Sequence, residues 1–162
     1  FINYGSHNNT KLLFEYGFII LDNQMDFLEF TLDDVNSYIK SDDELKHMVV
    51  PKHKYKFIRD HGLDNELFID INDGLNHNFQ AILSILLLPQ NLYNLTQVAF
   101  GDDLNFDDVK VHAIKIVENK KNEIKKLHDG LIKLEDLSES ALMCLKYFDA
   151  SIKLIDKVLT LL

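Results

Sequence analysis

Two tyrosines, each followed by glycine, are the residues of this chain whose types and spacing point most directly to chemistry. Tyr4-Gly5 ends a short apolar run from Phe1, and Tyr16-Gly17-Phe18 follows one short predicted helix. Each phenolic hydroxyl therefore comes at the end of an element, where it can donate and accept hydrogen bonds. This placement suggests a site. The alternative is that Tyr4, Tyr16 and Phe18 are core aromatics at a corner between a strand and a helix.

The elements around these tyrosines are predicted from local signals. Phe1–Tyr4 predicts a strand, and Asn8 or Asn9 can cap a short helix over 10–16. Gly17 stands where helices commonly end in a left-handed residue. An extended apolar run is then expected at 18–21, a turn at Asp22-Asn23, and a second strand at 27–32.

The rest of the chain predicts mainly helices. Glycine (6) and proline (2) are scarce, which favours long helices over a turn-rich sheet fold. Helices are expected at 33–40, at 44–61 with a break or a new start at Pro51, at 77–88, and from Pro89 to about 100; a short strand is expected at 67–71.

The last third predicts a long antiparallel helical hairpin. Apolar residues recur at spacings of three and four before and after a break near Asp136. A coiled-coil dimer fits the same spacing. Packing onto the preceding helices is preferred, because the apolar stripe is wide and Lys120 interrupts its first seam. The fold class expected is therefore mainly α and multihelical, ending in this hairpin, with a few short strands near the N-terminus.

Composition excludes several classes of protein. The net charge of −9 argues against binding to nucleic acid or to an anionic membrane, and it favours a basic protein partner, although it also fits a role in solubility alone. The lone Cys144 cannot form an internal disulfide. No secretory signal and no apolar run long enough to span a bilayer are visible. A cytoplasmic or nuclear location is expected.

Metal and phosphate motifs are not visible. None of the seven histidines has another histidine four residues away, and no cysteine pair exists. The segment from Asp70 to Gly74 has the wrong register for a calcium loop and is better explained as a hairpin turn. The six glycines are isolated from one another, so no phosphate-binding loop is expected. We expect no metal.

The first eighteen residues resemble the terminal motif of SET-domain methyltransferases of the Rubisco large-subunit methyltransferase class, nearest to the branch of SET-domain-containing protein four. The resemblance is carried by Tyr4-Gly5, His7, Asn9, Leu12-Leu13 and Glu15-Tyr16-Gly17-Phe18. Elsewhere it is weaker and rests on the segment 58–62, the apolar helix 77–88 and the closing helical pair.

The resemblance implies roles for three residues. Tyr4 would be the catalytic tyrosine, Tyr16 would line the substrate channel, and Phe18 would lie near that channel or the cofactor. Methyl transfer from S-adenosylmethionine to lysine needs a neutral, aligned amine. Aromatic walls hold the lysine stem and head, and a hydroxyl can orient the nitrogen.

The resemblance also implies that this chain is the C-terminal part of a protein-lysine methyltransferase. Residues 1–22 would end the SET domain, and 23–162 would form a helical substrate-binding domain. The cofactor-binding motifs would lie upstream, so this chain alone is expected to be inactive. The substrate is expected to be a basic protein, such as a ribosomal protein or a histone, and a histidine acceptor is also known in the class. A non-catalytic helical interaction module is the alternative.

Overall fold

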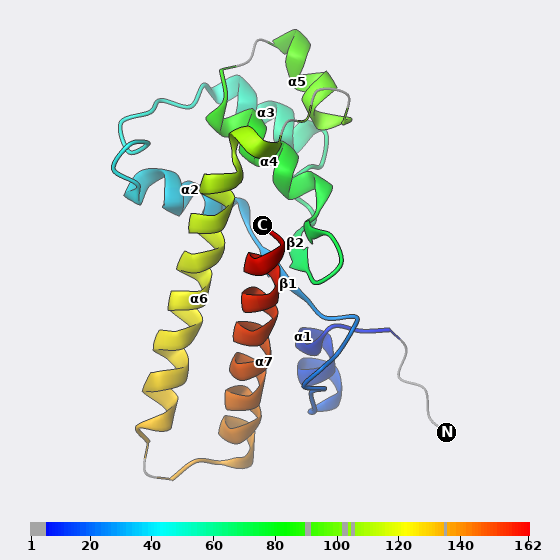
Figure 1. Ribbon diagram of the computed structural model, residues 1–162, viewed down its shortest axis with the longest axis vertical. Coiled ribbons are helices and arrows are strands. Elements are labelled where there is room, and N and C mark those ends of the chain that lie inside the picture. The colour runs from blue at the N-terminus through cyan, green and yellow to red at the C-terminus, as the bar shows by residue number, and fades with distance from the viewer. Residues whose placement is uncertain (1–5, 90–91, 102–103, 105, 135) are drawn as a thin grey trace.

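A long antiparallel helical hairpin forms one side of the molecule, as predicted (Figure 1). Its helices are α6 (Lys110–Ile132) and α7 (Glu139–Leu161). The side chain of Ser138 caps α7 by accepting from the amide of Ala141. The computed structural model describes residues 6–89, 92–101, 104, 106–134 and 136–162.

A small antiparallel sheet lies against α7. Its order is β1 (Phe27–Phe30), β2 (Leu67–Asp70), β3 (Gly74–Leu75), and Leu28 pairs with Ile69. The first two strands confirm the expected ones. The turn over 71–73 leads into Gly74, the first residue of β3, whose φ of 73° lies in the left-handed region. No strand occurs within residues 6–22, and the strand expected at 1–4 lies outside the described residues.

Four helices of eight to eleven residues account for much of the remainder: α2 (Leu32–Ser41), α3 (Lys52–Asp60), α4 (His77–Leu87) and α5 (Leu92–Ala99). Thr31 and Asp34 form a capping box on α2. The 3₁₀ turn η2 (Phe106–Asp108) precedes α6.

The helix expected over 44–61 is present from Lys52, and the new start expected at Pro51 is confirmed, but the part before Pro51 is not helical. Pro51 is the N-cap of α3, whereas residues 43–47 form turns. The Asp42 carboxylate accepts from the amides of Glu44 and Leu45, which stabilises a turn in place of a helix start.

The N-terminal segment is one short helical stretch. It starts as α1 (Asn9–Lys11), capped by Asn8, and widens into the π-helical turn η1 (Leu12–Tyr16). Gly17 ends it with φ 74°, as the sequence predicts. The expected helix over 10–16 is therefore present, although its second part is π-helical.

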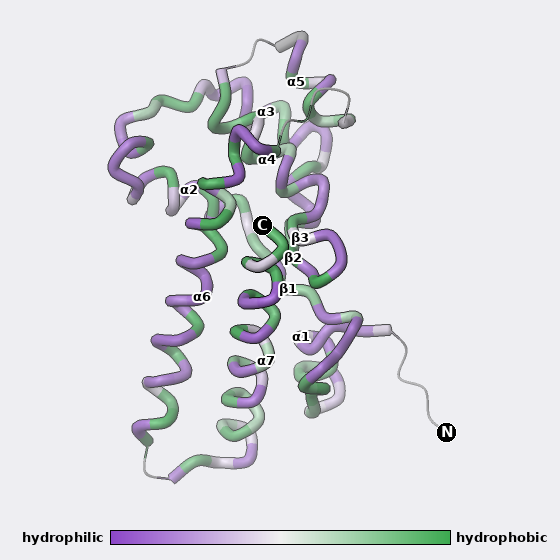
Figure 2. Tube along the Cα trace, in the orientation of Figure 1, coloured by the Kyte–Doolittle hydropathy of each residue, from purple (hydrophilic) through white to green (hydrophobic). Residues whose placement is uncertain are grey.

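The hairpin is anchored in the core at one end. Buried residues of α6, such as Ala113 and Val117, and of α7, such as Ile155 and Val158, share one hydrophobic cluster with α2, α4 and the sheet. Hydrophobic and hydrophilic stretches alternate along both helices (Figure 2). Lys120, which breaks the apolar seam, pairs with Asp34 at 3.0 Å and lies 5.6 Å from the centre of the Phe30 ring. Its role is therefore to join α6 to α2 and β1.

None of the helices in the described ranges is long and apolar enough to cross a membrane.

Candidate functional site

Two of the three residues singled out by the sequence lie together at the end of η1. The rings of Tyr16 and Phe18 are 6.3 Å apart, and the ring of His7 stacks on Tyr16 at the same centroid distance. Tyr16 is 43% exposed, and Phe18 is partly buried. Tyr4 lies outside the described residues. The described part of the predicted site is thus a small, half-open aromatic cluster.

Asn9 fixes the segment that follows the cluster. It is almost fully buried, and its side-chain amide donates to Ile20 O at 2.9 Å and accepts from Ile20 N at 2.8 Å. The same amide donates to Asp26 at 2.7 Å, and the backbone amide of Asn9 donates to the other carboxylate oxygen of Asp26 at 2.8 Å. Burial raises the pKa of Asp26, although these donors oppose the rise. The segment after Gly17 is therefore tied to α1 by side chains rather than by a strand.

The N-terminal segment also contacts α7 of the hairpin through two polar interactions. The hydroxyls of Thr10 and Tyr147 are hydrogen-bonded at 2.9 Å, and Asp22 forms an ion pair with Lys153. Both partners belong to α7, and Figure 1 shows α1 beside this helix. Residues 137 positions apart in the chain therefore fix where the aromatic cluster sits.

The described residues that carry the resemblance to a SET-domain terminus include both structural and exposed ones. Asn9, Leu12 and Gly17 have structural roles, because they are buried or hold a left-handed turn. Tyr16 exposes much of its ring, and so does Phe14, which is 82% exposed and which the sequence reasoning missed. An exposed aromatic surface of this kind can contact the apolar stem and the cationic head of a lysine.

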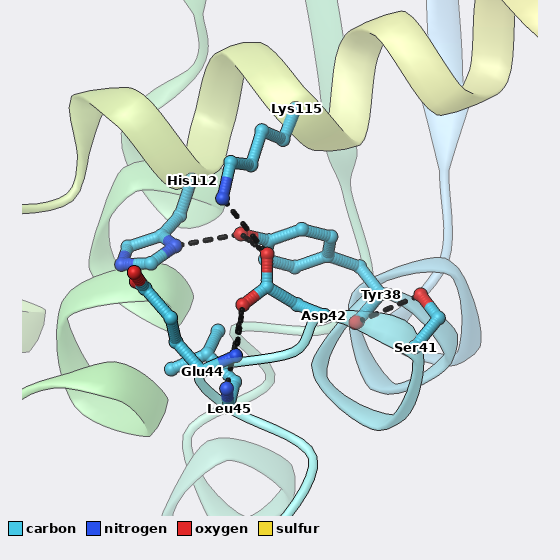
Figure 3. Close-up of polar contacts among 7 residues, drawn as sticks. All are labelled: Tyr38, Ser41, Asp42, Glu44, Leu45, His112 and Lys115. Atoms are coloured by element: carbon cyan, nitrogen blue, oxygen red, sulfur yellow. Dashed lines mark hydrogen bonds and ion pairs between the residues drawn. The ribbon is translucent and has the colours of Figure 1, made fainter.

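A second polar cluster lies where α2 crosses α6 (Figure 3). The hydroxyl of Tyr38 lies 2.6 Å from Nδ1 of His112 and donates to Asp42 Oδ2 at 3.2 Å. Lys115 donates to the same carboxylate oxygen at 2.9 Å. The Asp42 side chain is only 8% exposed, so the network is largely sheltered at its centre.

Hydrogen bonds and burial shift the pKa values of the residues in this network. The hydrogen bond from Lys115 lowers the pKa of Asp42 to about 2, and that of Lys115 is raised in return. Burial, and then the Asp42 charge, raise the pKa of Tyr38. Tyr38 therefore stays protonated and acts as a hydrogen-bond donor. Sequence reasoning missed this cluster, since its only local signal is the spacing of four between Tyr38 and Asp42.

A groove of about 430 Å³ continues from this crossing along α2 and α6. Asp33, Asp34, Glu123, Lys120 and Lys126 are among its lining residues. Two of its charges, Asp34 and Lys120, already neutralise each other. Over the described ranges, no group of three His, Cys, Asp or Glu side chains is arranged to hold a metal ion.

No family model and no curated protein matches this chain. Its function must therefore be argued from the residues and their arrangement.

Proposed function

We propose that this chain is the C-terminal, substrate-binding part of an S-adenosylmethionine-dependent protein-lysine N-methyltransferase. The observation that carries the proposal is the half-exposed cluster of His7, Tyr16 and Phe18 at the end of η1. It lies within the segment that resembles the end of a SET domain. The mainly helical body with its terminal hairpin agrees with the expected substrate-binding domain.

The chemistry of methyl transfer gives the cofactor, the three aromatic residues and the helical body separate roles. S-adenosylmethionine would supply the methyl group and would be bound mainly by SET residues upstream of this chain. Tyr4 would orient the acceptor amine through its hydroxyl, while Tyr16 and Phe18 would bound the channel that receives the side chain. The helical body would hold a basic protein substrate, in agreement with the net charge of −9. The chain by itself would not turn over.

The test uses the longer protein in which this chain follows its upstream SET segment. With labelled S-adenosylmethionine and basic protein fractions, we expect transfer of label to a protein. Tyr4→Phe should lower kcat on the order of 100-fold, because it removes the hydroxyl that aligns the amine. Tyr16→Ala should instead raise KM for the protein substrate. Hydrolysis of the product and amino-acid analysis would separate methyl-lysine from methyl-histidine.

Tyr55→Phe is the matched control. Its hydroxyl bonds Asn36 on α2, away from the aromatic cluster, so turnover should be unchanged. Full activity in Tyr4→Phe would remove the catalytic assignment. A complete absence of label transfer, with S-adenosylmethionine not bound, would overturn the proposed function.

A non-catalytic interaction module is the second candidate, and one observation favours it. Leu127, Ile132, Leu134 and Leu142 are each about half exposed near the loop of the hairpin. A concentration-dependent dimer in sedimentation, together with no methyl transfer by the longer protein, would support this candidate over the first.

A further inference from the structure

Two phenylalanines lie on the outer face of the small sheet. Along β1 and β2 the buried residues alternate with less buried ones, so Leu28, Phe30, Leu67 and Ile69 face the core. Phe27 and Phe68 fall on the opposite face, where an antiparallel sheet with one solvated side normally carries polar residues. Their presence there is not explained by the alternation that builds the fold.

These two rings contribute to a surface rather than to the interior. Within the described chain, neither belongs to the hydrophobic core nor to the partly buried side chains packed against it. The rings contact each other with centroids 5.2 Å apart and planes inclined by 48°. Both rings are partly exposed, and their inclined planes leave the pair accessible from the outer side of the sheet.

Two carboxylates line the same hollow as the rings. The register places Glu29 directly opposite Phe68. A hollow of about 260 Å³ is lined by Phe27, Glu29, Asn65, Glu66 and Phe68, among others. Glu29 and Glu66 are exposed, and no Lys, Arg or His in the described ranges pairs with either. The hollow combines aromatic surface with uncompensated negative charge.

We propose that this hollow, the outer sheet site, binds an arginine side chain of a basic protein segment. A guanidinium is planar, stacks on aromatic rings and donates in a fork that matches a carboxylate, so it satisfies both components of the lining. The net charge of −9 would draw a basic segment toward the chain. Docking of a methylation substrate through this site rests on the proposed function, whereas the binding itself does not.

The groove between α2 and α6 fits a cation less well, although it is larger. Asp34 and Asp42 at that crossing are already paired with Lys120 and Lys115. The lining of that groove also carries Lys120 and Lys126 beside its three acidic residues, so most of its negative charge is offset. At the outer sheet site a cation would meet Glu29 and Glu66 with no lysine, arginine or histidine in the lining.

The test is titration of the 162-residue chain with a fluorescent peptide of alternating glycine and arginine, measured by anisotropy at near-physiological salt without S-adenosylmethionine. The same peptide with citrulline in place of arginine keeps the shape and removes the charge. We expect saturable binding of the arginine peptide and at least about tenfold weaker binding of the citrulline peptide.

Variants locate the site. Glu29→Gln with Glu66→Gln should weaken binding about tenfold, and Phe27→Leu with Phe68→Leu about threefold or more. The matched control is Asp33→Asn with Glu123→Gln, which removes the same charge from the α2–α6 groove and should change affinity less than twofold. Circular dichroism and the urea midpoint of each variant check that the fold and its stability are retained.

If the two double charge variants weakened peptide binding equally, the peptide would be attracted only by the net charge of the chain, and the outer sheet site would be refuted. Absence of saturable binding would refute it as well. A lysine peptide that binds as tightly as the arginine peptide would overturn the choice of arginine. If the longer protein transfers methyl groups but the arginine peptide does not bind, this inference alone is refuted. Peptide binding by a longer protein that transfers no methyl group would refute the proposed function alone.

Discussion

Asn9 replaces a β-strand as the hydrogen-bonding partner of the residues after Gly17. Its side-chain amide donates to and accepts from the backbone of Ile20, which is what a neighbouring strand would do. The sequence predicts an extended run here, but it cannot show that one side chain serves as the partner. Local patterns record which residues are apolar, not which buried amide lies beside them.

The site residues also show that local sequence patterns do not predict contacts between distant parts of the chain. The pairing of Tyr16 with Phe18 follows from their closeness in sequence around Gly17, and so could be expected. The network of Tyr38, His112 and Lys115 could not, because its members are brought together by the crossing of α2 and α6, 73 or more positions apart.

Asp42 should make stability depend on pH. Its pKa is about 2 in the folded protein against 3.8 as the ordinary value, so the stabilisation is complete above about pH 4 and is lost as pH falls toward 2. In Lys115→Met the hydrogen bond that lowers this pKa is gone. The free energy of unfolding, measured with urea at a series of pH values, should therefore fall less steeply between pH 4 and pH 2.

Lys126→Met is the control for this experiment, since it also removes one lysine from α6 and, within the described ranges, Lys126 has no ion-pair partner. It should keep the wild-type slope. The same slope in Lys115→Met as in wild type would refute the assignment.

At the scale of elements, capping and periodicity predict most of the helices. The hairpin, α4, β1 and β2 agree with expectation because each has a strong apolar pattern. The error at 44–50 arose because this stretch contains residues compatible with a helix, while the deciding interaction is the Asp42 carboxylate with two amides ahead of it. The two-residue β3 is too short for any pattern to reveal.

Replacing Gly17 or Gly130 by alanine should change the stability of the protein in opposite directions. Gly17 has φ 74° with open space around it, so Gly17→Ala meets only backbone strain of about 1 kcal/mol. Gly130 is inside α6, also with open space, so Gly130→Ala should raise the free energy of unfolding by about 0.5–1 kcal/mol.

Hydrogen exchange and urea unfolding would check this pair. The Ile20 amide should exchange about fivefold faster in Gly17→Ala, because the turn that presents it to Asn9 is destabilised. Unchanged exchange there, or lower stability in Gly130→Ala, would contradict the prediction.

At the scale of the molecule, the main core does not depend on the N-terminal segment. Every residue of the large hydrophobic cluster lies at Leu28 or later. Leu12 is buried but stands outside that cluster.

A chain of residues 23–162 should therefore fold. We expect its helical circular dichroism per residue and its cooperative urea transition to match those of the whole chain, with a midpoint lowered only slightly. A chain lacking α7 is the opposite control, because Ile155 and Val158 belong to the core. A molten or unfolded 23–162 chain would show that the proposed boundary at 22 is not a domain boundary.

The apolar burial of the hairpin is concentrated at one end, and this makes its stability graded. Core burial is concentrated near the start of α6 and the end of α7, whereas Leu127, Ile132, Leu134 and Leu142 are about half exposed toward the loop. Helix ends with few buried contacts open at low free energy without global unfolding. We therefore expect the two helices to fray from the loop inward as a small cooperative unit, and this end to tolerate insertions that the anchored end would not.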